Sequence, residues 1–162
     1  MIAILDNIRS VHNVGSIFRT ADGAGVRKIY LCGITPKPLD EFGRVRDDFR
    51  KVSLGAEESV EWEKVESIVE LVKKLKDEGV QVVAVEQDDR SVSYKDWKPD
   101  GEVAFVFGSE VGGVSRGVLD MVDVVVDIPM RGKKESVDVG VSFGGIVYEF
   151  QSITPPRRRR FL

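Results

Sequence analysis

Three short segments of this 162-residue sequence combine glycine with side chains that donate, accept or carry charge. They are residues 13–19, 108–113 and 128–138. Glycine lets a backbone approach a ligand closely. Carboxylates, hydroxyls, amides and a guanidinium supply groups that can hold and orient a substrate. The three segments are therefore candidates for a ligand site, although each also has a plain structural interpretation.

Residues 108–113 read Gly-Ser-Glu-Val-Gly-Gly and directly follow the apolar run Val103–Phe107. They match neither the G-x-G-x-x-G dinucleotide pattern nor the P-loop, which disfavours an ordinary nucleotide-binding domain. A tight turn from strand to helix also explains the glycines. Glu110 is harder to explain as a surface charge, because it comes just after a run typical of a buried strand.

Residues 128–138 are rich in charge and end where the last helix is expected to begin. Asp138 is a good N-cap residue, and capping alone would account for it. Met130 and Val137 either line an apolar slot or pack in the core, and the sequence leaves both alternatives open.

The first segment places Arg19 about one and a half helical turns beyond Asn13. A solvated surface arginine is the ordinary interpretation of Arg19, and Asn13 is suited to cap a helix. His12 is the single histidine, and no second His or Cys stands at metal-ligand spacing, so we expect no metal. Cys32 ends an apolar run, which predicts a packed thiol rather than a nucleophile.

Short apolar runs alternate with helical patterns, and these elements must position the three segments. We expect strands at 2–5, 28–32, 80–85, 103–107 and 122–128, and helices at 14–24, 65–78, 116–121 and 139–151. Residues 34–58 are loop-rich, with one helical turn near 46–52. The alternation predicts a single-domain α/β fold with a parallel sheet. Ligands bind beyond the carboxyl ends of such strands, so we expect the site in the loops after Val85, Phe107 and Ile128.

The composition is that of an ordinary globular domain, with 42% hydrophobic and 31% charged residues. No apolar stretch approaches the roughly 20 residues needed to span a bilayer, and the N-terminus lacks signal-peptide features. With a single cysteine, this predicts a cytoplasmic protein. The net charge of −3 does not itself suggest nucleic-acid binding, although Arg157–Arg160 form a basic run. We expect a domain over residues 1–153 and a basic tail over 154–162, which is alternatively a solvated tail or an expression scar.

Taken together, the segments resemble the TrmH-type branch of the SPOUT RNA methyltransferases. Residues 13–20 are similar to the first motif of that family, and residues 107–113 are similar to the second. Residues 128–139, with Tyr148-Glu149, are similar to the third, and residues 54–57, with Val60 and Trp62, to a connecting segment. The resemblance covers nearly the whole chain, and three ordered motifs at the right separations make it specific.

The resemblance implies a C-terminal trefoil knot, an exception to the rule that chains do not thread loops. It implies S-adenosyl-L-methionine as cofactor, held in a bent shape mainly by backbone groups of the knot loops. It also implies a homodimer in which the first-motif arginine of one chain completes the site of the other. The reaction it implies is methyl transfer to a ribose 2′-hydroxyl of tRNA or rRNA.

Matching residue by residue, the resemblance implies catalytic roles for Arg19, Asn13, Glu110, Ser136 and Asp138. It implies cofactor contacts for Val85, Gly108, Ile128, Met130, Ser136 and Val137. The family usually has Asn where this chain has Asp138. Asn both donates and accepts hydrogen bonds, whereas an ionised Asp only accepts.

A guanidinium is a poor base, so we expect Arg19 to stabilise developing oxyanion charge or to grip a phosphate. Asp138 is an alternative proton acceptor. The candidates for phosphate contact are Arg44, Arg46, Arg50, Lys51, Arg131, Lys133, Lys134 and the C-terminal arginines. No separate RNA-binding domain is evident, which favours tRNA over rRNA. The alternative function, favoured by Asp138 and the acidic net charge, is an RNA-binding module with weak or no methyltransferase activity.

Assembly can also be predicted from apolar surface. The last expected helix carries more apolar side chains than one core face needs. We expect it to form a two-fold interface with the first helix. The interface would use Val139, Phe143, Ile146, Val147 and Phe150 together with Val14, Ile17 and Phe18.

Overall fold

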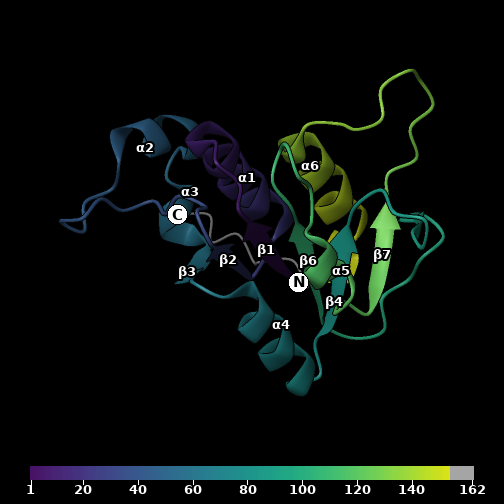
Figure 1. The fold of residues 1–162 in the computed structure, drawn as a ribbon. Coiled ribbons are helices and arrows are strands. Elements are labelled where there is room, and N and C mark those ends of the chain that lie inside the picture. Colours follow the sequence, from purple (N-terminus) through teal and green to yellow (C-terminus); the bar gives the residue numbers. More distant parts are fainter. Residues whose placement is uncertain (154–162) are drawn as a thin grey trace.

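The computed structural model describes residues 1–153, and the expected basic tail lies outside the described residues. In this part of the chain, seven strands form one parallel sheet of order β3-β2-β1-β6-β4-β7-β5 (Figure 1). The strands are β1 (Ile2–Asp6), β2 (Lys28–Cys32), β3 (Glu61–Val65), β4 (Gln81–Val85), β5 (Val92–Ser93), β6 (Val103–Phe107) and β7 (Val124–Asp127). The predicted α/β class and parallel sheet are confirmed.

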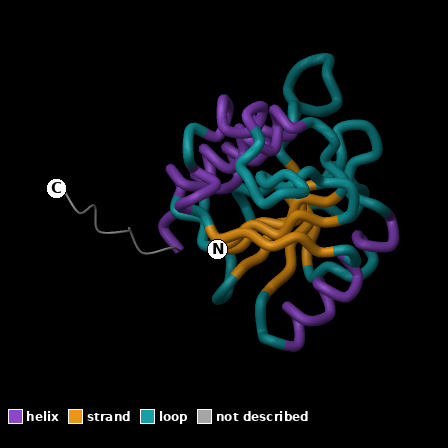
Figure 2. Tube along the Cα trace, turned by 90° about the vertical axis from the view of Figure 1, so that its left-hand side faces the viewer, coloured by secondary structure: helices purple, strands orange, loops and turns teal. Residues whose placement is uncertain are grey.

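Helices cover both faces of this sheet (Figure 2). One face carries α1 (Val11–Ala24), α2 (Asp47–Ser53), α3 (Ala56–Ser59) and α6 (Val139–Glu149), which is followed by the 3-10 turn η1 (Gln151–Ile153). The other face carries α4 (Ile68–Asp77) and α5 (Arg116–Leu119). None of the described helices is long and apolar enough to cross a membrane.

The central strands are apolar on both sides because both faces are covered. In β1, Ala3 and Leu5 point into the core beneath α1 and α6, whereas Ile2 and Ile4 point toward α4. β6 is likewise buried along its whole length. This two-sided burial is why the sequence shows near-continuous apolar runs at these strands.

The first helix starts earlier than expected, and Asn13 is not its cap. α1 begins at Val11 because the hydroxyl of Ser10 accepts a hydrogen bond from the Asn13 N–H at 3.1 Å. Gly25 ends the helix as expected, with a φ of 75° that glycine adopts readily.

Two edge elements also differ from expectation. Val65 was expected to open a helix, but it ends β3, and Ser67 caps α4 instead. β3 reads Glu-Trp-Glu-Lys-Val and lies at the edge of the sheet, so charged side chains interrupt the apolar pattern that marks a buried strand. At the opposite edge, β5 has only two residues, too few to give a pattern.

The predicted two-fold interface is wrong in its residues. The apolar side chains named for it on α1 and α6 are buried within the chain, since the two helices pack against each other and against the sheet. The apolar side chains that α6 leaves exposed are Val141 and Tyr148, at 63% and 47%. These two residues are the apolar side chains that α6 offers to a partner.

Candidate functional site

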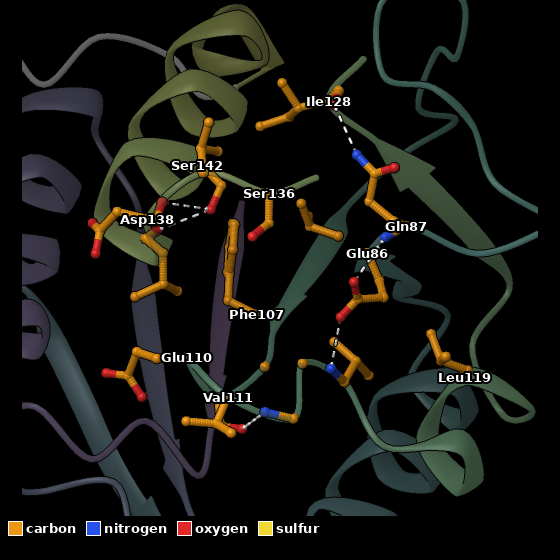
Figure 3. A pocket seen from close by; sticks show the side chains of 18 of the residues that line it. Glu86, Gln87, Phe107, Glu110, Val111, Leu119, Ile128, Ser136, Asp138 and Ser142 are labelled. Atoms are coloured by element: carbon orange, nitrogen blue, oxygen red, sulfur yellow. Dashed lines mark hydrogen bonds between the residues drawn. The ribbon is translucent and has the colours of Figure 1, made fainter. Parts of the chain in front are cut away.

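A cavity of about 610 Å³ lies at the carboxyl ends of β4, β6 and β7 (Figure 3). The loops that follow these three strands and the first turn of α6 form its lining. This is the location that the sequence predicted, after Val85, Phe107 and Ile128. The volume is typical of a small-molecule or cofactor site.

The loop after β6 folds back on itself to make one wall. Ser109 and Gly113 exchange backbone hydrogen bonds of 3.2 and 2.9 Å, and the Ser109 hydroxyl accepts the N–H of Gly112 at 3.0 Å. A Cβ on Gly108 would lie 2.1 Å from the carbonyl carbon of Gly113, so only glycine fits this close approach. The glycines do form a tight turn, and that turn is a wall of the cavity.

Glu86 and Gln87, which sequence analysis missed, tie the three loops together. Glu86 accepts hydrogen bonds from the N–H of Val114 at 2.9 Å and from the N–H of Gln87 at 2.8 Å. The Gln87 side-chain amide donates to the carbonyl of Ile128 at 3.2 Å, as Figure 3 shows. Their position just after a buried strand, beside the predicted Val85, was the signal that could have found them.

Two predicted site residues, Glu110 and Asn13, meet although they lie 97 positions apart. The Asn13 side-chain amide donates to the Glu110 carboxylate at 3.1 Å. The N–H groups of Arg9 and Ser10 donate to the same carboxylate at 3.2 and 3.3 Å. Glu110 therefore anchors the loop after β6 to the start of α1.

The protonation of Glu110 follows from these contacts. Burial acts to raise the pKa of its carboxyl group. Hydrogen bonds from its own N–H, from Arg9, from Asn13 and from Ser10 outweigh burial and hold the pKa below its ordinary value. Glu110 is therefore ionised at neutral pH and acts as a hydrogen-bond acceptor.

The loop after β7 brings Met130, Ser136, Val137 and Asp138 to the opposite wall. Asp138 caps α6, because its Oδ1 accepts the N–H of Gly140 at 2.8 Å, which confirms the capping role. Asp138 is also one of the residues that line the cavity, although its carboxylate points away from Ser136 and Phe107 (Figure 3). Met130 and Val137 line the cavity too, so the apolar slot is the better of their two interpretations.

A sequence model of the SpoU rRNA Methylase family matches residues 1–148. The chain belongs to the SpoU rRNA methylase family. It is 33% identical over 162 residues to the 23S rRNA (guanosine-2'-O-)-methyltransferase of Neisseria meningitidis serogroup B, a match that covers 100% of this chain and 60% of that protein. This SpoU-family chain spans 57–60% of the length of the curated relatives it matches.

Solved structures share the SpoU-family fold. The A. aeolicus TrmH/SpoU tRNA modifying enzyme superposes with a TM-score of 0.80 at 29% identity, over 94% of this chain and 74% of that one. The AdoMet-bound rRNA methyltransferase from Sinorhizobium meliloti superposes with a TM-score of 0.84 at 24% identity, over 93% of this chain and 55% of that one. The first supports the family assignment as well as the fold, and the second supports the fold.

Most of the residues that the motifs named gather in this SpoU-family cavity, and Arg19 does not. The cavity lining includes Val85, Gly108, Glu110, Ile128, Met130, Ser136, Val137 and Asp138. Asn13 is hydrogen-bonded to one of these residues, Glu110. Arg19 is exposed on α1 and is absent from the lining. It stands six residues beyond Asn13, so it points to another side of the helix. The roles of all these residues stay predictions.

Metal-ligating side chains and the cysteine thiol are the other reactive groups of residues 1–153. Among residues 1–153, no three His, Cys, Asp or Glu side chains are placed to hold a metal ion. Cys32 is fully buried, which confirms the packed thiol. Burial, followed by the nearby Asp6 carboxylate, raises the pKa of Cys32 to about 12, so this thiol is not a nucleophile at neutral pH.

Proposed function

We propose that this SpoU-family chain transfers a methyl group from S-adenosyl-L-methionine to a ribose 2′-hydroxyl of RNA. The observation that carries the proposal is the cavity, which three motif-bearing loops enclose at the carboxyl edge of the sheet. The S. meliloti neighbour is described as AdoMet-bound, and the Neisseria relative as a guanosine-2'-O-methyltransferase. These descriptions support the cofactor and the ribose oxygen, respectively.

The residues present fit this cofactor. Val85, Ile128, Met130 and Val137 supply an apolar lining, and backbone groups around Gly108 come close because no side chain intervenes. Such a mixture of apolar surface and a few polar groups is typical of cofactor sites. When bound, the sulfonium supplies an electrophilic methyl group, and the protein must position a ribose oxygen against it.

We infer that the loops after β6 and β7 form the trefoil knot that the resemblance implies. β4 lies between β6 and β7 in the sheet, so these loops face each other across its end. Glu86 and Gln87 at that end bind both loops, through Val114 and Ile128. Threading one loop through the other would make this cavity rigid before the ligand arrives.

In the proposed homodimer, Arg19 of one copy reaches the cavity of the other. Arg19 is exposed and lies outside the cavity of its own chain, which is the arrangement that a shared site requires. Tyr148 of α6 lies against Gly23 of α1, and with Val141 it leaves apolar surface exposed beside Arg19's helix. A cation at the cavity mouth would stabilise charge that develops on the ribose oxygen.

The RNA class is a further part of the proposal. The Neisseria relative acts on 23S rRNA, and the A. aeolicus neighbour is described as tRNA-modifying. Both descriptions support an RNA substrate, and the tRNA preference stays a prediction. Parallel assays on tRNA and rRNA transcripts test it.

Calorimetric titration with S-adenosylmethionine tests the cofactor site. Val137→Trp should fill the cavity and weaken binding so far that no heat is measured at millimolar cofactor. Val69→Trp is a matched control, because Val69 is 39% exposed and Val137 is 38% exposed, and Val69 lies on α4 across the sheet. No binding by the wild type at millimolar cofactor, or equal binding by Val137→Trp, would contradict the proposal.

A second function, RNA binding with weak or no methyl transfer, is favoured by one observation. Asp138 is a lining residue of the cavity at a position where the family pattern has Asn, so an acidic residue replaces a neutral one there. Cofactor and RNA binding by the wild type, without transfer under single-turnover conditions, would select this alternative.

A further inference from the structure

The segment between β2 and α2 projects from the body of the molecule beside α2 (Figure 1). It carries Phe42, whose side chain is 73% exposed. The other phenylalanines of residues 1–153 are all buried in the core. Its exposed ring offers apolar surface whose burial by a partner is favourable.

This ring is held outward by a locked turn. The Asp40 carboxylate accepts the N–H groups of Phe42 and Arg44, both at 2.9 Å. Leu39 and Val45 pair as an isolated bridge, and Gly43 adopts a φ of 76° between them. These contacts hold the backbone of the turn that carries Phe42.

One face of the Phe42 ring carries a cation. The Arg44 guanidinium lies 5.0 Å from the ring centroid and donates from Nε to Asp40 at 3.0 Å. Proteins bind unpaired RNA bases by stacking them on aromatic rings and on arginine guanidinium planes. Phe42 and Arg44 together offer both kinds of surface.

The isolation of the ring favours RNA over a protein partner. Asp40 and Asp48 are engaged by Arg44 and Arg46, so their charge is compensated within the segment. Arg50 is likewise paired, with Glu57 and Glu58. The other exposed charges of residues 37–51 are Lys37 and Lys51 beside Glu41 and Asp47. A protein interface centres on contiguous apolar residues, whereas Phe42 is an isolated ring between the charged Glu41 and Arg44.

The point at which this segment leaves the sheet also favours RNA as its partner. The segment follows β2, and only β1 separates β2 from β6. Because all these strands are parallel, the segment leaves from the same edge that carries the cavity. We propose that Phe42 stacks on an unpaired base of the RNA substrate, at a nucleotide other than the one methylated, an inference that rests on the proposed RNA function.

Fluorescence anisotropy with two RNA probes tests this stacking. One probe is a 12-nucleotide mixed-sequence single strand with a central 2-aminopurine, and the other is a 12-base-pair duplex. Phe42→Leu keeps an apolar side chain but removes the ring, and should weaken single-strand binding by roughly 5- to 100-fold. Phe42→Trp should retain binding and quench the 2-aminopurine, and duplex binding should be the same for all three proteins. Val69→Ala, on the opposite face, is the control for loss of an exposed apolar side chain.

Equal single-strand affinity for wild type and Phe42→Leu would overturn the proposal. A change of oligomeric state in Phe42→Leu, measured by light scattering, would also overturn it, because the ring would then belong to a contact between copies. A wild type that binds neither probe overturns it as well, and the calorimetric titration with cofactor then decides separately on the proposed function. Unchanged cofactor affinity in Phe42→Leu shows that the variant is folded.

Discussion

At the scale of single residues, Asp138 and Glu110 both line the cavity, and the carboxylate of each stabilises the local fold. Asp138 caps α6 with Oδ1, and the cap does not engage its other carboxylate oxygen. Glu110 uses both oxygens to hold Arg9, Ser10 and Asn13. These contacts lead to opposite expectations for the amide variants Asp138→Asn and Glu110→Gln.

Asp138→Asn should keep or raise the rate of methyl transfer. Asn caps helices about as well as Asp and is the residue that the family usually has, so stability should change little. If Asp138 were the base, the same change would cost roughly 10²–10⁴-fold in rate. Single-turnover rates across pH decide between these roles. A loss above about a hundredfold with cofactor binding intact would show that Asp138 takes the proton.

Glu110→Gln should lower stability at neutral pH and matter less in acid. The folded state holds the pKa of Glu110 below its ordinary value of 4.5. The ionised group therefore stabilises the fold at pH above that value, and this contribution is lost as the pH falls through the folded-state pKa. Urea unfolding at pH 7 and below pH 4 measures the difference in the free energy of unfolding between wild type and Glu110→Gln, which should be smaller at the lower pH. Glu78→Gln, at the exposed end of α4, is the control, and a pH-independent difference for Glu110→Gln would contradict the account.

At the scale of elements, burial decides what the sequence could predict. β1, β4 and β6 are covered on both faces and give continuous apolar runs, so their positions were predicted closely. β3 and β5 lie at the sheet edges and lack that pattern. The same contrast holds in the site. The rule for parallel strands located its loops, but the pairs Glu86–Val114 and Asn13–Glu110 depend on tertiary packing across 28 and 97 positions.

Gly108→Ala should damage the loop after β6. Its Cβ would meet the backbone of Gly113 at 2.1 Å, so the wall of the cavity must open. Overpacking of this kind costs roughly 1–3 kcal/mol, equivalent to a Tm lower by several degrees. Cofactor affinity should fall in parallel, measured by calorimetry. Gly132→Ala is the matched control in the neighbouring loop, because its Cβ would meet nothing within 4 Å. Equal melting curves for the two variants would contradict this view of the loop.

At the scale of the whole molecule, Arg19 lies outside the cavity of its own chain. We therefore expect a composite site to which two copies of the chain contribute. Arg19→Ala should lower turnover by roughly two or more orders of magnitude with cofactor affinity unchanged, since it removes one charge-stabilising donor. Val137→Trp should be inactive for a different reason, a filled cavity. Each variant lacks one half of the proposed shared site.

Mixing these two inactive variants should restore activity. Random pairing makes half of the dimers mixed, and each mixed dimer has one complete site, so about a quarter of wild-type activity should return. Methyl transfer after co-expression, with light scattering on the same sample, measures this. No recovery in confirmed mixed dimers would place Arg19 in the site of its own chain, and a monomer at micromolar concentration would remove the shared site altogether.

The chemistry itself is tested most directly by following the methyl group. The protein is incubated with unmodified tRNA or 23S rRNA transcripts and S-adenosylmethionine carrying a trideuterated methyl, and the RNA is digested to nucleosides for mass spectrometry. We predict a trideuterated 2′-O-methylnucleoside, formed by the wild type and by Val69→Trp and absent with Val137→Trp. A heavy methyl on a base, or no labelled nucleoside from either RNA with the wild type, would contradict the assignment of this cavity to ribose methylation.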